Sequence, residues 1–199
     1  MPEQSSQSSL PGFDALPQQP TDRLFFAIFP DANASARIAA LALQLRGEHE
    51  LRGRPLARER FHVTLHHLGD YVGVPSDVVA MADTAAAAVT TMAPFEVAFD
   101  RAASFSSAPR NRPFVLRGGD GVAALTEFQQ ALGMAMKKAG LGRWAKPGYT
   151  PHVTLLYDDR CVVEQAVETI SWTAREFVLV HSLLGQTRHV ALARWPLRG

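Results

Sequence analysis

The sequence has few of the features that mark specialised protein classes. Cys161 is the only cysteine in 199 residues, which excludes an internal disulfide and a cysteine-based zinc site. No apolar run approaches the length of a membrane span, and the first residues lack the basic-then-apolar order of a signal peptide. The formal net charge is +1, so no overall field favours a nucleic acid or a membrane as partner. These features predict a cytoplasmic protein that does not bind membranes.

The composition that remains is that of a globular protein. Hydrophobic residues make up 47% of the chain and charged residues 20%, and the length allows a sizeable core in one domain. Residues 1–22 are rich in Ser, Gln and Pro, which predicts a disordered N-terminal tail. We therefore expect a single folded domain, with two lobes, over residues 23–199.

A tetrapeptide, His-Val-Thr-Leu, occurs twice, at residues 62–65 and 152–155. Each copy lies in a short apolar run near turn residues, which predicts a strand. Because strand side chains alternate between faces, the His and Thr of each copy share one face, and the Val and Leu point to the other. A single His-x-Thr is more often a structural pair, but packing does not require the same pair twice. The repeat therefore predicts one site built from four side chains: His62, Thr64, His152 and Thr154.

Strands and helices alternate along the rest of the chain. Apolar runs predict strands at 24–29, 61–68, 95–105, 113–117, 149–157, 176–184 and 189–195. Helical spacing predicts helices from Asp31 or Asn33 to Gly47, from 75 to about 92, from 120 to about 140, and a short one at 162–169. The two rounds of this order indicate a weak internal duplication. We expect an α+β fold in which two related lobes face each other across one cleft.

Two imidazoles and two hydroxyls that meet at one point suit a phosphodiester substrate. Because the ordinary pKa of histidine is about 6.5, one ring can accept a proton while the other donates one near neutral pH. Threonine hydroxyls can donate hydrogen bonds to the phosphate oxygens. The set predicts acid–base hydrolysis without a metal or other cofactor. A zinc site on His62 and His66 is disfavoured because no carboxylate or third ligand has suitable spacing.

A resemblance to a known family is carried by the stretches RERFHVTLHHLGD, GYTPHVTLLYDD, RPFVLRG and REFVLVHSLLGQTRHVALARWPL. They resemble the RNA 2′,3′-cyclic phosphodiesterase family, also called 2′-5′ RNA ligase, of the 2H phosphoesterase superfamily. The resemblance covers residues 23–197. It implies a two-lobed α+β fold of two pseudo-symmetric antiparallel sheets, with helices packed outside and a central cleft.

The resemblance also implies an activity and a role for each motif residue. Family members hydrolyse 2′,3′-cyclic phosphate ends of RNA or nucleotides to 2′-phosphates, and some join 2′-5′ linked RNA reversibly. By motif position, His62 would donate a proton to the 3′-leaving oxygen and His152 would activate water. Thr64 and Thr154 would hold the phosphate. The expected partner is an RNA end or nucleotide with a 2′,3′-cyclic phosphate, bound by a monomer.

The chain departs from the family pattern at His66 and Tyr157, where basic residues are common. If the first motif strand continues regularly, His66 shares the face of His62 and Thr64 and could enter the cleft. The alternative is a strand-end histidine in solvent. His67 is then expected to point the other way.

Further candidates near the motifs are Tyr149, which could stack on a base or pack in the core, and Arg143, a loop residue that could meet RNA phosphates. Three other histidines lack a partner motif and are expected to be surface or structural residues: His49, His181 and His189. Two alternatives stay open. One is a non-catalytic nucleotide or RNA-end binding module, and the other is an enzyme for a different cyclic or 2′-5′ linked phosphodiester, such as ADP-ribose cyclic phosphate or oligoadenylate.

Overall fold

A computed structural model describes residues 18–106 and 109–199. Its helices are α1 (Ala32–Glu48), α2 (Ser76–Ala87) and α3 (Ala123–Lys138). Its strands are β1 (Asp22–Ile28), β2 (Val63–Tyr71), β3 (Phe95–Ser104), β4 (Arg112–Arg117), β5 (His152–Asp158), β6 (Gln165–Ala174), β7 (Glu176–Leu183) and β8 (Arg188–Pro196). The predicted tail lies outside the described residues up to position 17, and β1 begins at its last residue, Asp22.

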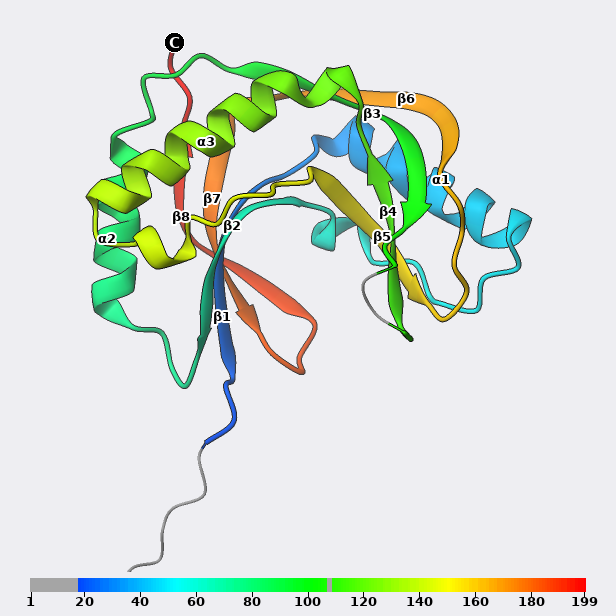
Figure 1. The fold of residues 1–199 in the computed structure, drawn as a ribbon, viewed down its shortest axis with the longest axis horizontal. Helices are drawn as coiled ribbons and strands as arrows, with labels where there is room; N and C mark the ends of the chain where they lie inside the picture. The colour runs from blue at the N-terminus through cyan, green and yellow to red at the C-terminus, as the bar shows by residue number, and fades with distance from the viewer. Residues whose placement is uncertain (1–17, 107–108) are drawn as a thin grey trace, which may run out of the picture.

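The strands form an eight-stranded antiparallel sheet in the order β6-β3-β4-β5-β2-β1-β7-β8. Its two halves of four strands splay apart, with helices on the outside (Figure 1). At the centre β2 and β5 join the halves through one residue pair, Val63 with Val153. The α+β class is therefore confirmed, and the two predicted sheets are two halves of one sheet.

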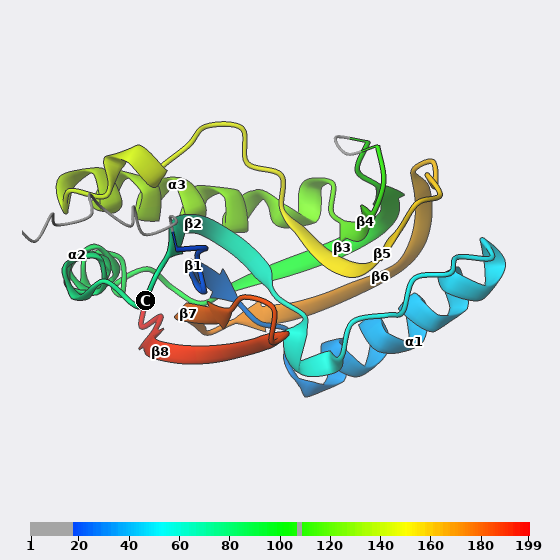
Figure 2. The same cartoon turned by 90° about the horizontal axis from the view of Figure 1, so that it is seen from below.

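One half is built from the consecutive strands β3 to β6, and the other combines β1 and β2 with β7 and β8. The β3–β4 pair precedes β5 and packs beside it, whereas β7 and β8, from the end of the chain, complete the half that contains β1 and β2. Seen from below, β8 lies along the lower edge of this half, next to β7 (Figure 2). The two motif strands become neighbours because the chain crosses between the halves.

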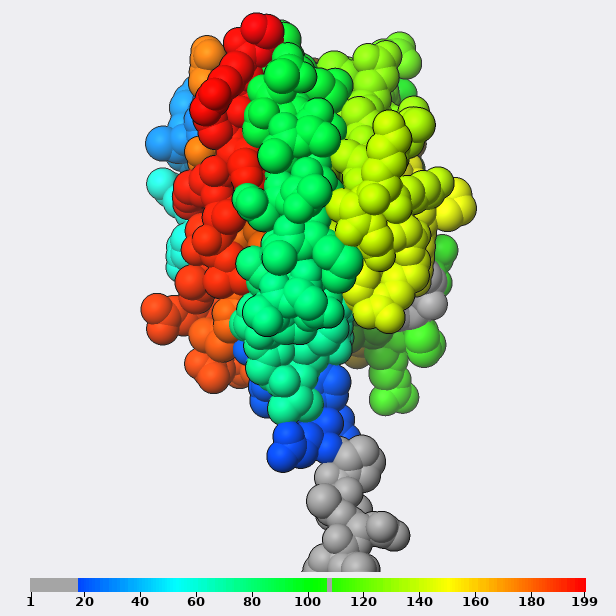
Figure 3. Space-filling view, turned by 90° about the vertical axis from the view of Figure 1, so that its left-hand side faces the viewer, coloured from blue at the N-terminus to red at the C-terminus, as the bar shows by residue number. Residues whose placement is uncertain are grey.

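The helices cover the outer side of the sheet. α1 packs against β5 and β6, and α3 packs against β2 and β3. Figure 3 shows α2 lying between β8 and α3 on one side of the molecule. None of the helices among the described residues is both long and apolar enough to cross a membrane.

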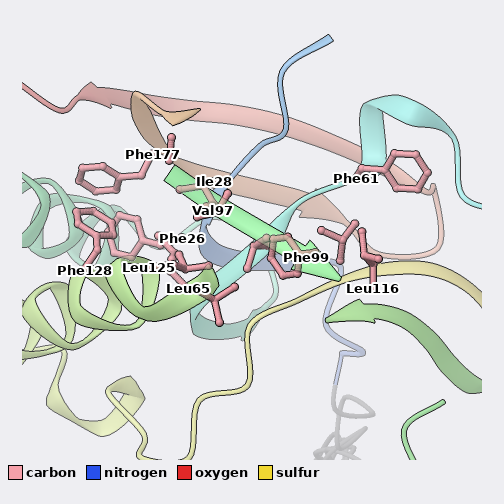
Figure 4. Packing of buried hydrophobic residues seen from close by; sticks show 14 of the residues in the cluster. Phe26, Ile28, Phe61, Leu65, Val97, Phe99, Leu116, Leu125, Phe128 and Phe177 are labelled. Carbon is pink, nitrogen blue, oxygen red and sulfur yellow. The ribbon is translucent and has the colours of Figure 1, made fainter. Parts of the chain in front are cut away.

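The hydrophobic core runs beneath both halves of the sheet, and Figure 4 shows part of it. It takes Ile38 from α1 and Phe128 from α3, both with no exposed surface. The Val and Leu of both motif copies are buried in it, with at most 3% of their surface exposed. The prediction that the apolar face of each motif packs on a core is confirmed, and this packing fixes the opposite face.

The prediction of a short helix at 162–169 is wrong, because β6 begins at Gln165 and pairs with β3 from Phe95 to Ala102. Burial alternates along the strand at Ile170, Trp172 and Ala174. This two-residue period is typical of a strand with one buried face. Its buried residues follow the stretch 162–169 for which a helix was predicted.

Candidate active site

The antiparallel pairing of β2 with β5 brings the two motif copies side by side at the centre of the sheet. Four half-buried side chains line one cavity of about 330 Å³: His62, Thr64, His152 and Thr154. The cavity lies on the face opposite the buried Val and Leu of each motif. The structure thus brings together all four residues that the repeat singled out.

The two motif histidines are held by the same local hydrogen bond. The Nδ1 of His62 lies 2.7 Å from the carbonyl oxygen of Arg60, and the Nδ1 of His152 lies 2.8 Å from that of Thr150. In each case Nδ1–H donates to the carbonyl two residues earlier, which fixes the tautomer and leaves Nε2 available for a ligand. Both rings therefore present the same nitrogen for proton transfer.

An aromatic ring supports each motif histidine. The ring centroids of Phe25 and His62 are 5.0 Å apart, and Phe105 meets His152 edge-on at 4.9 Å. These contacts restrict rotation of the imidazoles about their side-chain bonds, in addition to the Nδ1 hydrogen bonds. The sequence did not indicate either phenylalanine, because Phe25 lies on β1 and Phe105 follows β3.

Both copies of the motif contain a bulge at their leucine. Two consecutive residues of β1 pair with His66 and Thr64 of β2, so the leucine between them is skipped. In the same way, two consecutive residues of β4 pair with Leu156 and Thr154 of β5. The leucine is therefore the extra residue in each strand, and the residue after it stays on the core side. The shared irregularity supports the weak duplication inferred from the sequence.

The bulge overturns the placement predicted for His66 and His67. His66 is 5% exposed, lies beneath α3 and bonds through Nε2 to the carbonyl oxygen of Gln129 at 2.9 Å. His67 instead lines the motif cavity. Regular alternation predicted the reverse, and neither the cleft nor the solvent position proposed for His66 is correct. Gly133 of α3 leaves room for the ring, since a Cβ there would lie 3.1 Å from it.

Electrostatics favour neutral imidazoles in this cavity. Burial lowers the pKa of His62 to about 4, helped by the positive charges of His189, His152 and Arg60 and opposed by the Arg60 carbonyl. Burial also lowers the pKa of His152, with a smaller contribution from Arg117. A bound anion would stabilise the protonated forms and raise both values.

The family comparison agrees with this geometry. The family model of the 2′-5′ RNA ligase superfamily matches residues 29–186. The chain belongs to the 2′-5′ RNA ligase superfamily. It is similar to the solved structure of Escherichia coli LigT complexed with 3′-AMP, at 27% identity and a TM-score of 0.65, over 91% of this chain and 100% of LigT. No curated protein matches the chain.

Other solved structures show the same similarity. LigT complexed with ATP is 26% identical, with a TM-score of 0.64 over 91% of this chain and 100% of that one. A protein described as a phosphoesterase is 26% identical, with a TM-score of 0.66 over 89% and 99%. A protein of Thermus thermophilus, at 22% identity and a TM-score of 0.66 over 89% and 98%, shows the fold alone. The 2H phosphoesterase fold is thereby confirmed.

Arg60 lines the motif cavity of this 2′-5′ RNA ligase superfamily member close to His62. It has no ion-pair partner among the described residues. Arg23, which also lines the cavity, is held by two hydrogen bonds of 2.7 Å to Asp70, so its charge is largely balanced. Asp70 also bonds His67 at 3.1 Å. A phosphate that enters would meet the unbalanced guanidinium of Arg60 beside His62.

The loop that leads to the first motif is hydrogen-bonded to the second motif strand, β5. The Asp158 carboxylate accepts hydrogen bonds from the backbone N–H groups of Arg52 and Gly53 at 2.6 and 2.7 Å, and Leu56 N–H donates to Leu155 O at 2.8 Å. Because the loop and β5 approach so closely, a Cβ on Gly53 would lie 1.9 Å from the carbonyl oxygen of Tyr157. These contacts fix the position of His62 relative to His152.

The other candidates from the sequence lie in different places. Tyr157 lines the motif cavity and is 43% exposed. Tyr149 lines a separate pocket of about 560 Å³ with His66, and burial raises the pKa of its hydroxyl. Arg143 stacks on Trp144 at 3.7 Å and does not line the motif cavity. The structure therefore separates Tyr149 and Arg143 from the four motif residues.

Sequence reasoning missed His189, which lines the motif cavity next to His62. It lies on β8, more than a hundred residues from the first motif, and reaches the cavity because β7 pairs with both β1 and β8. No local pattern marks this position, since the contact depends on the strand order.

Proposed function

We propose that this protein is an enzyme that hydrolyses the 2′,3′-cyclic phosphate of an RNA end or nucleotide to a 2′-phosphate, without a metal. The observation that carries the proposal is the matched pair of imidazoles in one cavity, each fixed through Nδ1 so that Nε2 is available. Such a pair can supply an acid and a base on two sides of one phosphorus. The complexes of LigT with 3′-AMP and with ATP support a nucleotide as ligand for the related cavity.

The reaction we propose is a single in-line displacement. Neutral His152 removes a proton from water, and the oxygen of that water bonds to phosphorus. The bond between phosphorus and the 3′-oxygen breaks, and protonated His62 gives its proton to that oxygen. Thr64 and Thr154 donate hydrogen bonds to the non-bridging oxygens, and Arg60 balances the developing charge. The products are a 2′-phosphate and a 3′-hydroxyl.

We predict that turnover of a 2′,3′-cyclic nucleotide survives exhaustive dialysis against EDTA. The physical reason is that the side chains that line the cavity provide the acid, the base and the oxyanion donors themselves. The assay would follow product by phosphorus NMR, which separates the 2′- from the 3′-phosphate. A loss of turnover that zinc or magnesium restores would reject the metal-free mechanism, and a 3′-phosphate product would mean that His62 protonates a different oxygen.

We also predict that a plot of kcat/KM against pH is bell-shaped, and that the midpoints of both limbs lie below the ordinary histidine pKa of about 6.5. The kcat/KM profile reports the free enzyme, in which burial lowers the pKa of His62 to about 4 and also lowers that of His152. The rate needs one imidazole protonated and one neutral. The kcat profile reports the complex, in which the phosphate anion raises both values, so its optimum should lie at higher pH. Coincident kcat and kcat/KM profiles would contradict this expectation.

A further inference from the structure

His189 forms a three-ring cluster with His62 and Phe25. The ring of His189 stands edge-on to His62, with centroids 5.2 Å apart and planes at 79°, and edge-on to Phe25 at 5.5 Å and 78°. Phe25 contacts His62 in turn. The β7–β8 hairpin carries His189 to this position, where it pairs with Ser182. The His62 ring is therefore packed between a phenylalanine from β1 and a histidine from β8.

The hydrogen bonding of His189 differs from that of the two motif histidines. Its Nδ1 is buried and, among the described residues, has no hydrogen-bond partner. The Nδ1 atoms of His62 and His152 instead donate to carbonyl oxygens. Within the described part of the chain, no hydrogen bond from Nδ1 thus fixes the tautomer or the protonation state of His189. Its charge depends on its surroundings, and burial and the nearby Arg60 lower its pKa.

The charges around His62 come from several elements. Arg60 precedes it in the chain, His152 faces it from β5 and His189 faces it from β8. The packing from β1 is uncharged, because Phe25 provides it. The rest of the cavity holds the Arg23–Asp70 pair and His67. His189 is therefore the titratable group in ring contact with His62, and protonation of either ring disfavours protonation of the other.

We propose that His189 is a positioning residue for His62, which holds the His62 ring in place by edge-on packing and limits its protonation by its own charge. The catalytic meaning of this inference rests on the proposed function, because it makes His189 a control on the proton donor. The physical coupling between the two rings does not depend on any substrate. A variant without a charge at position 189 should therefore change the titration of His62 in the free protein.

The test is the titration of His62 in the full chain, followed by NMR with isotopically labelled histidine. His189→Phe keeps a ring against His62 and Phe25 but removes the charge, so the pKa of His62 should rise measurably above its parental value. His189→Asn keeps a polar group without the ring and should also raise it. The matched control is His67→Phe, which removes an imidazole that lines the same cavity without ring contact to His62. In that variant the pKa of His62 should stay at its parental value.

The outcomes separate this inference from the proposed function. An unchanged pKa of His62 in folded His189→Phe, or an equal rise in the His67→Phe control, would overturn the coupling. If His189→Phe fails to fold, the His189→Asn titration decides by the same criterion. Failure of the parent to hydrolyse any 2′,3′-cyclic phosphate would reject the proposed function, while the titration would still decide the coupling. If both hold, the kcat/KM profile of His189→Phe should move to higher pH with the pKa of His62.

Discussion

Replacing His62 or His152 with alanine is expected to lower turnover of a 2′,3′-cyclic nucleotide by roughly 10²- to 10⁴-fold. Each substitution removes either the acid or the base of one displacement, whereas Thr154→Ala removes only a positioning hydrogen bond and should cost less. The two histidines act in the same step, so the double variant should lose less than the product of the single losses. Steady-state rates for the four variants and the parent would measure these effects. Each single-histidine variant should also lose one limb of its pH profile.

The control for these variants is His49→Ala, the same substitution outside the motif cavity. His49 bonds Gln165 at 3.0 Å and packs on Phe114, so it should keep parental turnover. His62 and His152 are half-buried at the cavity wall, and we expect their variants to stay folded in a thermal denaturation scan. Parental turnover in a folded His62 or His152 variant would reject the two-histidine mechanism and favour a binding module.

The second large effect concerns stability. Gly53→Ala is expected to lower the free energy of unfolding by roughly 1 to 3 kcal/mol, the usual cost of overpacking. The added Cβ would lie 1.9 Å from the Tyr157 carbonyl oxygen, so either the loop or β5 must move. That movement would strain the hydrogen bond from Gly53 N–H to Asp158. Urea unfolding, extrapolated linearly to water, would measure the change.

Gly47→Ala is the matched control for this prediction. Gly47 lies near the end of α1, and a Cβ there would meet no atom within 4 Å. Alanine favours the helix over glycine, so this variant should be more stable than the parent by about 0.5 to 1 kcal/mol. The same chemical change should thus have opposite signs at the two positions. Equal stabilities of the two variants would show that the loop adjusts without cost.

The residues that could be predicted from the sequence are those whose placement depends on local alternation. The Val and Leu of each motif fix one face of a strand in the core, and this places His62 and Thr64 on the other face. The same rule failed two residues later, at His66, because a bulge reverses the alternation. A glycine often marks a bulge, but here a leucine takes that position in both copies, so the sequence offered no signal.

Contacts between distant strands were beyond the reach of the sequence. The short helix expected at 162–169 is the start of an edge strand, where local spacing and the pairing with β3 disagree and the pairing prevails. His189 was set aside because no motif accompanied it, yet the strand order places it in ring contact with His62. Both errors come from tertiary pairing, which single-sequence patterns do not record.

The half that carries His62 combines strands from distant parts of the chain, which has a consequence for biosynthesis. β1 precedes β7 by more than a hundred residues but pairs with it, and β8 completes the same half. Since synthesis proceeds from the N-terminus, the half that carries His62 cannot close until β7 and β8 have been synthesised. Pairings of such wide sequence separation also form slowly. A chain cut before β7 would retain both His-Val-Thr-Leu segments and yet have no neighbour for one side of β1, so the half that carries His62 does not correspond to one continuous piece of the sequence.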